Sequence, residues 1–360
     1  PPGEMLRALT TAVGALRRRG VTKPRDHLVT LTEITGNFTA MLVKRTPFVE
    51  AEIEKLRAWS SQRPSFGISF EPASSKSEIR NTYQEFMALD DERLERRYIA
   101  NYPFDIRPAT DDRPFFFNSS FWWHLFPDQQ LFAEQPKDWT VVPVLQLSLL
   151  VLAAAVSVVM VVAVSLPLRF LFRRGLPSAG KNRIGLYCAG AALGYLAIEI
   201  ALMQLFGLFL GHPNYAISVV LATLLFFSGL GSLWAEAILS RLGNVRFVAY
   251  LLSATIFLEY VLIFPRLSSL LGLPFFLRAL ITAALVLPIG ICLGVFLPTI
   301  LDAMKRHSPH LVPWAWGVNG IFSVLAPLLA VAVATTFGIS ALLLASVPIY
   351  LTVAFSFPGS

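Results

Sequence analysis

Five polar residues stand inside or beside long apolar stretches of this 360-residue chain: Glu199, Gln204, His212, Glu259 and Asn319. Polar side chains are costly in a bilayer, so they mark polar pockets, cation or proton paths, or hydrogen bonds between helices. A buried carboxylate such as Glu199 needs a partner or a proton, and both the pocket and the packing interpretation stay open for it. Asn319 lies at the start of the sixth stretch and His212 in the short turn between the second and third, and for both we favour packing or turn roles.

The run Asp111-Asp112-Arg113 is a second candidate, because it lies shortly before the chain turns apolar. Two adjacent carboxylates with one arginine could hold a metal ion or take part in acid–base chemistry. The same residue types also form a turn with an Asx-type cap and an ion pair. We favour the structural turn and keep the functional alternative open.

The helices that must carry the first set are membrane helices. The chain is 55% hydrophobic and only 15% charged, which is typical of membrane proteins. A spanning helix needs roughly twenty mainly apolar residues. Seven stretches meet this requirement, at about 140–168, 184–210, 214–239, 247–264, 275–300, 314–337 and 339–357. Only Gly338 separates the last two, which predicts a tight hairpin.

The net charge of +7 belongs entirely to the apolar half. Residues 1–138 hold nineteen Lys/Arg and nineteen Asp/Glu, whereas residues 139–360 hold eleven Lys/Arg and four Asp/Glu. A basic excess confined to membrane-flanking loops excludes a nucleic-acid surface as its explanation. We expect no nucleic-acid partner. The expected partner is the lipid bilayer, with other subunits of a membrane complex as a further option.

The basic loops also predict an orientation. Loops after the first, third and fifth stretches carry nine basic residues, namely Arg169, Arg173, Arg174, Lys181, Arg183, Arg241, Arg246, Lys305 and Arg306. The loops after the second and fourth stretches carry only Arg266 and Arg278. The positive-inside rule places the first group in the cytoplasm, so the polar N-terminal part is expected on the non-cytoplasmic side of a bacterial inner membrane.

Residues 1–113 are predicted to form a partial α/β domain. A helix is expected at 4–19 and another at 48–60, with strands at 27–32, 38–44 and 67–70 and a turn at Gly36-Asn37. This order is typical of the second half of a doubly wound domain. A polar helical segment is expected over residues 76–98.

The nucleotide-binding signature of such domains is missing from the sequence of residues 1–138. No G-x-G-x-x-G occurs there, and the chain has no Cys/His spacing of a metal site. We therefore expect no cofactor or metal in this chain, and an S-adenosylmethionine-type cofactor only if an upstream domain exists. Residues 114–138, rich in aromatic side chains, are expected to lie at the membrane surface, and residues 139–360 to form the transmembrane bundle.

A set of short motifs makes the chain resemble a bacterial family of membrane-embedded spermidine-synthase-like proteins. The motifs are Leu42 to Phe48, Tyr102 to Asp105, Thr110 to Phe117, Ile198 to Ile200, Phe209 to Pro213, Ser228 to Ser232 and Pro313 to Gly320. The resemblance implies an aminopropyltransferase- or methyltransferase-like α/β domain joined to a membrane bundle, with this chain as the C-terminal part. The family's cofactor loop and catalytic Asp have no matching position, so no catalytic residue carries over.

Three functions remain open. In the first, the chain is part of a membrane-bound transferase. In the second, it is a transporter-like bundle for an amine, polyamine or other small cation. In the third, it is a non-catalytic accessory subunit that acts as a scaffold. Absence of the nucleotide loop weighs against catalysis by this chain alone, so its status as an enzyme stays undecided.

Overall fold

The structure is a computed structural model that describes residues 2–33, 38–74, 81–89, 91–125, 143–171, 181–307 and 309–357. The chain divides into two compact units. The first unit contains Pro1–Thr110 and Pro114–Leu147, and the second contains Asp111–Arg113 and Ser148–Ser360. A short piece of the junction therefore packs with the second unit.

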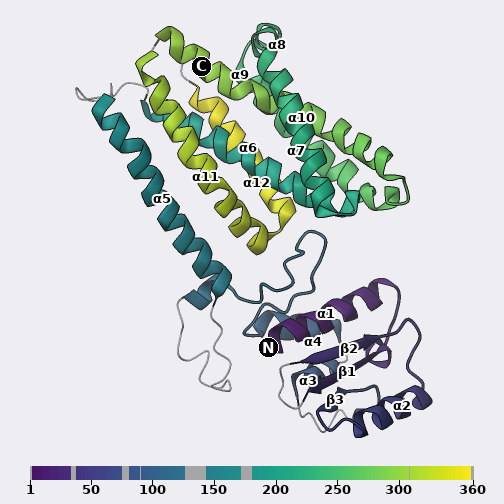
Figure 1. The fold of residues 1–360 in the computed structure, drawn as a ribbon. Helices are drawn as coiled ribbons and strands as arrows, with labels where there is room; N and C mark the ends of the chain where they lie inside the picture. The colour runs from purple at the N-terminus through teal and green to yellow at the C-terminus, as the bar shows by residue number, and fades with distance from the viewer. Residues whose placement is uncertain are drawn as a thin grey trace. The chain divides into compact units, whose positions relative to one another are not determined.

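The first unit is built on a three-stranded sheet in the order β2-β1-β3 (Figure 1). The strands are β1 (Leu28–Glu33), β2 (Thr39–Val43) and β3 (Phe66–Phe70), close to the predicted positions. β1 is antiparallel to both neighbours, with Thr30 opposite Met41 and Phe70. The expected doubly wound arrangement, which has parallel neighbours, is therefore wrong for these strands.

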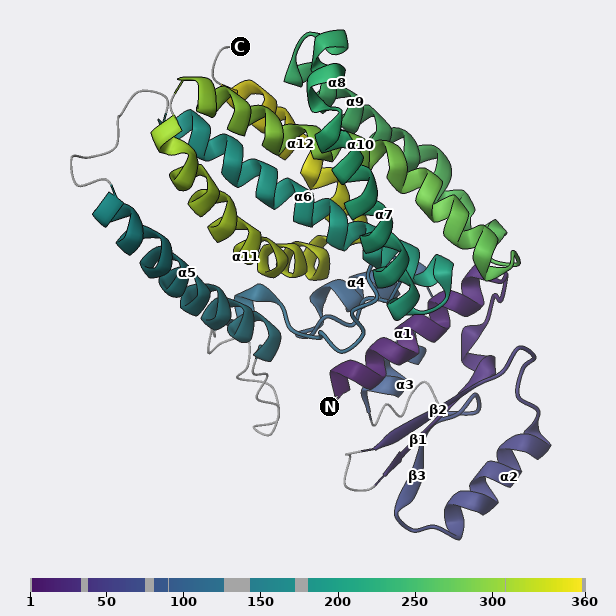
Figure 2. The same ribbon diagram turned by 45° about the horizontal axis from the view of Figure 1, so that its top comes forward.

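The short connection between β1 and β2 explains why these strands are antiparallel. Only residues 34–38 join β1 to β2, whereas a parallel crossover needs about a dozen residues or more. The longer connection from β2 to β3 contains α2 (Glu50–Ser61), which lies beside β3, and β1 sits between the two strands (Figure 2). This is a split β-α-β unit. The predicted turn at Gly36-Asn37 lies outside the described residues.

Helices cover the sheet of the first unit and supply most of its core. Besides α2 they are α1 (Pro2–Arg18), η1 (Pro24–His27), α3 (Thr82–Met87), α4 (Glu92–Asn101) and η2 (Trp122–Leu125). Leu6, Leu9, Val13 and Leu16 of α1 are buried at helical spacing, and they belong to the same core cluster as Phe70 of β3.

The predicted polar helix over residues 76–98 is two helices. The Asn81 side chain accepts a hydrogen bond from the amide of Gln84 and begins α3, and the Asp91 side chain accepts one from Arg93 and begins α4. Each cap satisfies an amide that a helix start leaves without a partner, so two starts replace the single long helix. Residues 75–80 and 90 lie outside the described part.

The second unit contains almost all of the apolar sequence as helices. They are α5 (Val144–Leu171, whose first four residues belong to the first unit), α6 (Lys181–Leu210), α7 (Pro213–Leu233), α8 (Ala235–Leu242), α9 (Val245–Leu258), η3 (Glu259–Ile263), η4 (Phe264–Leu270), α10 (Phe275–His307), η5 (Pro309–Leu311), α11 (Val312–Phe337) and α12 (Ile339–Ser356). Seven helices or helix runs of the described part are long and apolar enough to cross a membrane, which confirms the seven predicted stretches. α6 packs against α7, α10, α11 and α12 and is central in Figure 1.

Two of the seven stretches differ in detail from the prediction. The third ends at Leu233, and α8 follows as a separate short helix after Trp234. The fourth continues past α9 as a π-helical turn, η3, and a 3-10 turn, η4. Pro265 explains the second difference, because proline has no amide hydrogen to donate and its ring displaces the carbonyl one turn before it.

α7 and α10 approach each other closely through small residues. A Cβ on Gly294 of α10 would overlap the Ser228 carbonyl of α7, and one on Gly231 would overlap the Ile291 carbonyl of α10. Only glycine permits such backbone contact, as in the small-residue interfaces of membrane helices. This contact fixes the serine-bearing face of α7 beside α10.

Candidate functional site

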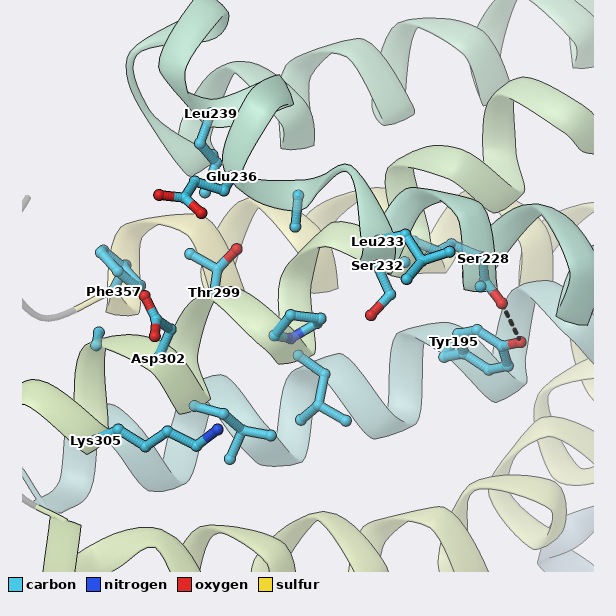
Figure 3. Close-up of a pocket in the computed structure, with 18 of the residues that line it drawn as sticks. Tyr195, Ser228, Ser232, Leu233, Glu236, Leu239, Thr299, Asp302, Lys305 and Phe357 are labelled. Atoms are coloured by element: carbon cyan, nitrogen blue, oxygen red, sulfur yellow. Dashed lines mark hydrogen bonds between the residues drawn. The ribbon is translucent and has the colours of Figure 1, made fainter.

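A large cavity, which we call the outer cavity, lies in the helical bundle. Its volume is about 1120 Å³, and α6, α7, α8, α10 and α11 contribute to its lining. Figure 3 shows side chains from several of these helices directed into the same space. Its polar lining side chains include Tyr195, Ser228, Ser232, Glu236, Thr299, Asp302 and Lys305. A cavity of this size is large enough for a small organic ligand.

The break between α7 and α8 positions the charged end of the outer cavity. Trp234 closes α7 by donating its amide to the Leu230 carbonyl, and Glu236 follows in the first turn of α8. In Figure 3, Glu236 lies near Thr299 and Asp302, which α10 contributes. Two carboxylates from different helices thus border one end of the cavity.

The charged end also contains basic groups. Arg306 donates to the Asp302 carboxylate at 2.7 Å, one helical turn away, so this acid is neutralised locally. Neither Glu236 nor Lys305 forms a hydrogen bond or ion pair with a described residue. With one acidic and one basic side chain available, this end of the cavity does not strongly favour either anionic or cationic ligands.

The opposite end of the outer cavity has hydroxyl groups and no charge. Ser228 and Ser232 are four residues apart and therefore share a face of α7. The Tyr195 hydroxyl lies 3.4 Å from Ser228 Oγ, and Ser228 also donates to the Leu225 carbonyl at 3.2 Å. Polarity therefore falls from ionised groups to hydroxyls along the cavity (Figure 3).

A second cavity, called the inner chamber here, lies between α6, α10, α11 and α12. Its volume is about 320 Å³, and Tyr195 and Tyr350 are among the residues that line it. The Asn319 amide nitrogen donates to the Cys188 carbonyl at 3.3 Å, and the Tyr350 hydroxyl donates to the Ala191 carbonyl at 3.3 Å. Tyr195 lines both cavities.

The five predicted intramembrane residues do not form one site. Only Asn319 lines either of these two cavities. His212 is the N-cap of α7, where its Nδ1 accepts the Asn214 amide at 3.2 Å. Glu199 is partly buried on α6, one turn beyond Tyr195.

Gln204 and Glu259 each have a buried oxygen without a hydrogen-bond partner in the described part of the chain. The Glu259 side chain is the more enclosed, because the residue is only 4% exposed. It stands at the start of the π-helical turn η3, a distortion that is frequent at functional sites. Neither residue shares a hydrogen bond or a cavity with Asn319 in the described part of the chain.

Asp111–Arg113 packs against the hairpin between α11 and α12. The Asp112 carboxylate accepts the Ser340 amide at 2.6 Å, and its backbone carbonyl accepts the Ile339 amide at 2.9 Å. Arg113 donates to the Thr335 carbonyl at 3.3 Å. Asp112 thus caps the N-terminus of α12 from a distant part of the sequence.

Gly338 makes this cap possible. Its φ is +104°, which side-chain-bearing residues rarely adopt, and a Cβ there would overlap the Asp112 carboxylate. Asp111 and Asp112 also border a largely apolar cavity of about 540 Å³ with α6 and η4. A ligand-binding role for the acidic run stays a prediction.

Arg7 organises the first unit, and the sequence did not single it out. The residue is 5% exposed, its Nε donates to the Arg107 carbonyl at 3.0 Å, and it forms an ion pair with Asp105 at 3.1 Å. Its Nη1 donates to the carbonyls of Phe115, Phe116 and Asn118, at 2.9, 2.9 and 2.7 Å. The aromatic run that was expected at the membrane surface is therefore anchored to α1 through its backbone. Residues 126–142 lie outside the described part.

The electrostatics of Asp105 follow from these partners. Burial alone would raise the pKa of Asp105, but hydrogen bonds from Arg107 and the positive charges of Arg7 and Arg107 outweigh it. The pKa of this carboxyl group therefore lies below its ordinary value. Asp105 stays ionised while it is only 4% exposed.

Sequence reasoning missed most of the cavity residues, although one signal was present. Residues 139–360 contain four acids, Glu199, Glu236, Glu259 and Asp302, and two of these line the outer cavity. The two that line it, Glu236 and Asp302, stand near helix ends, where charged residues usually face water without having a specific function. Tyr195 and the serines gave no signal, because hydroxyls in membrane helices commonly bond to their own helix.

Among the described residues, no group of three or more His, Cys, Asp or Glu could hold a metal ion.

Comparisons with protein-family models, with curated proteins and with solved structures found no match for this chain. Function is therefore inferred from the residues of the two cavities.

Proposed function

We propose that this chain is a multi-pass membrane protein whose helical bundle binds a small polar solute in the outer cavity and moves it through the bundle, as a transporter does. The supporting observation is the cavity itself. It joins a charged end, where Glu236 and Lys305 have no hydrogen-bond or ion-pair partner among the described residues, to a hydroxyl-lined end at Ser228 and Tyr195. Glu236 and Lys305 are exposed near helix ends, and the hydroxyl groups of Tyr195 and Ser228 extend the polar lining into the apolar part of the bundle.

The resemblance to spermidine-synthase-like membrane proteins is part of this proposal at the level of architecture. It rests on the motif set, which includes Ser228 to Ser232 and Pro313 to Gly320. Both motifs contribute residues to the outer cavity. A transferase reaction would need a cofactor site that residues 1–138 do not encode in sequence, so the binding function is the one we favour.

Orientation in a bacterial inner membrane is proposed from the charge of the loops. Nine basic residues flank one set of ends and two flank the other, which supports a cytoplasmic location for Lys305 and Arg306 and a non-cytoplasmic one for the first unit. Reporter fusions after residues 307 and 357 test this. A cytoplasmic reporter should be active at both sites, because α11 and α12 cross the membrane twice between them, and inactivity at both sites would reverse the orientation.

Filling the outer cavity tests the proposed function. Gly229 lines the cavity, and a Cβ placed on it meets no atom within 4 Å, so Gly229→Trp should fill the space without disturbing helix packing. Gly207 on α6 is equally open and lines neither cavity, so Gly207→Trp is the matched control.

The measurement is uptake of radiolabelled tetramethylammonium, glycine and acetate into proteoliposomes that contain the purified chain. We expect saturable uptake of at least one probe, lowered at least tenfold by Gly229→Trp, a factor equivalent to about 1.4 kcal/mol, and unchanged by Gly207→Trp. Equal uptake by the two variants, or no saturable uptake of any probe, would refute the proposal.

A further inference from the structure

The outer cavity and the inner chamber share one wall. Tyr195 of α6 and Leu293 and Leu297 of α10 line both spaces. The two leucines offer only apolar surface, so Tyr195 is the polar group at this boundary. Its hydroxyl points toward Ser228 on the outer side (Figure 3). Tyr195 therefore supplies the polar part of the wall between the two spaces.

Tyr195 is held in place weakly. The distance from its hydroxyl to Ser228 Oγ is 3.4 Å, whereas hydroxyl–hydroxyl bonds are usually about 2.7–2.8 Å. Ser228 has an alternative acceptor in the Leu225 carbonyl, so it keeps a hydrogen bond when Tyr195 leaves. Rotation of the Tyr195 ring therefore breaks one long hydrogen bond, and the Ser228 hydroxyl still donates to the Leu225 carbonyl.

The inner chamber has the chemistry of a cation site. Its lining includes the rings of Tyr195, Phe296 and Tyr350, and the last two have centroids 4.6 Å apart. None of the described residues that line it is Lys, Arg, Asp or Glu. Ring faces carry partial negative charge and attract ammonium groups but repel anions.

Polar groups of α11 complete the chamber with hydrogen-bond acceptors. The Asn319 amide nitrogen is engaged with the Cys188 carbonyl, which leaves Oδ1 as its acceptor, and Ser323 bonds to no described residue. Glu199 follows Tyr195 by four residues on α6 but does not line the chamber. No base offsets these groups in the described lining.

Size limits the ligand. The chamber volume is about 320 Å³, roughly twice that of an engineered 150 Å³ cavity that accepts benzene. A primary or quaternary ammonium ion with a few carbon atoms fits this space.

We propose that the inner chamber is a second binding site, selective for a small ammonium-type cation, and that the Tyr195 ring closes it from the outer cavity. This inference rests on the proposed function and adds the sign of the solute's charge and the position of the gate. The balanced charges around Glu236 and Lys305 admit a solute, and the aromatic chamber selects it.

Thiol labelling of the full chain in lipid nanodiscs tests both parts without knowledge of the natural solute. The background replaces the two native cysteines, Cys188 and Cys292, by alanine, and both are buried. Single cysteines then report on three places: Ser232→Cys on the outer cavity, Ser323→Cys on the inner chamber, and Ser346→Cys on a buried position of α12 that lines neither cavity.

Two methanethiosulfonate reagents are compared, one with a trimethylammonium group and one with a sulfonate group. We expect Ser232→Cys to react with both, and Ser323→Cys to react at least about tenfold faster with the cationic reagent, the factor that a modest cation–π preference supplies. Ser346→Cys should stay unlabelled by either reagent.

Changes at Tyr195 test the gate. Tyr195→Ala should raise the cationic labelling rate of Ser323→Cys roughly tenfold or more and leave that of Ser232→Cys unchanged, because only the inner space lies behind the ring. Tyr195→Phe keeps the ring and loses one weak hydrogen bond, so its rate should stay within about fivefold of the parent. This milder variant also separates loss of the gate from loss of folding.

The outcomes separate the two proposals. If Ser232→Cys is labelled while Ser323→Cys is inert even with Tyr195→Ala, or reacts equally with both reagents, the chamber is no cation site and only this inference fails. An Ala variant that leaves Ser323→Cys as slow as its parent would remove Tyr195 as the gate. If Ser232→Cys itself is inert, the outer cavity is closed to solutes, and the proposed function fails as well.

Discussion

The two units bury ionisable side chains in opposite ways. In the first unit, Arg7 is 5% exposed and meets Asp105 together with four backbone carbonyls. In the second unit, Glu259 is 4% exposed and its Oε2 has no hydrogen-bond partner among the described residues. A fully paired charge holds a fold together, whereas a buried carboxyl group without a partner costs stability and needs another reason to be there.

The comparison extends to the cavities. Asp112 is partnered by the amides of α12 and acts as a cap, while Glu236 borders the outer cavity without a described partner. Asp112 with its complete partners therefore belongs to the framework, whereas Glu236 is placed where a solute can bind. Four experiments test this distinction, in order of decreasing expected effect.

Loss of Arg7 should be the most damaging change. Arg7→Met leaves the Asp105 carboxylate buried with one partner fewer and several carbonyls unsatisfied, and it should cost the first unit about 3–5 kcal/mol. Hydrogen exchange of the β1 amides in the full chain measures this loss. Arg96→Met is the control, because that exposed pair with Glu92 should contribute less than about 1 kcal/mol. Equal protection in both variants would show that Arg7 is not a structural centre.

Gly338→Ala should rank second. It forces a side-chain-bearing residue to φ near +104° and pushes on Asp112, with an expected cost of about 2–3 kcal/mol. Asp112→Ala, which only removes the cap, should cost about 1–2 kcal/mol. Unfolding in micelles of rising SDS content measures both, and Gly272→Ala, where a Cβ meets no atom within 4 Å, should change stability by less than about 0.5 kcal/mol. An Asp112→Ala variant of normal stability but impaired solute uptake would give the acidic run a functional role instead.

Acid should weaken the first unit through Asp105. Because the folded state lowers the pKa of this group, its contribution is complete above the unfolded pKa of about 3.9 and is lost as pH falls through the folded pKa. Hydrogen exchange of β1 measured between about pH 5 and pH 2.5 should therefore show stability falling with acidity. Asp105→Asn should be less stable at pH 5 and should show a shallower decline. A parallel decline in both proteins would assign the acid sensitivity to other carboxylates.

Glu259→Gln should have the smallest effect on folding. The amide has the same shape and removes a potential charge from a site that offers Oε2 no partner, so stability should change by no more than about 1 kcal/mol. SDS unfolding compares it with Asp112→Ala. A loss as large as that expected for Arg7→Met would mean that Glu259 is a paired structural charge, and the contrast between the units would disappear.

The sequence predicted the helices well because membrane spans leave a strong local signal. Length and apolar composition located all seven, and Gly338 correctly marked the hairpin between the last two. The ends of the predicted stretches were less accurate where the helix is interrupted, as at Trp234 and Pro265. The strands were placed within a few residues, but strand direction depends on which strands pair, and a familiar domain order suggested the wrong arrangement.

The candidate site was harder to predict, because a cavity depends on contacts between distant helices. Asn319 was selected by its polarity and does line the inner chamber. Tyr195 reaches both cavities only because α6 lies at the centre of the bundle, which no local pattern reveals. Arg7 was missed for the same reason, since its partners Asp105 and Asn118 are about a hundred residues away.

The cap that Asp112 provides for α12 has a consequence for biosynthesis. The carboxylate and the Ser340 amide are separated by 228 residues, so the ribosome makes the cap long before it makes the helix. Chains are synthesised at roughly 5–20 residues per second, so the acidic run waits on the order of ten seconds or more for its partner. The N-terminus of α12 is capped only when Asp112 meets the Ser340 amide. Insertion of α12 is therefore the step that fixes the Asp111–Arg113 segment to the bundle.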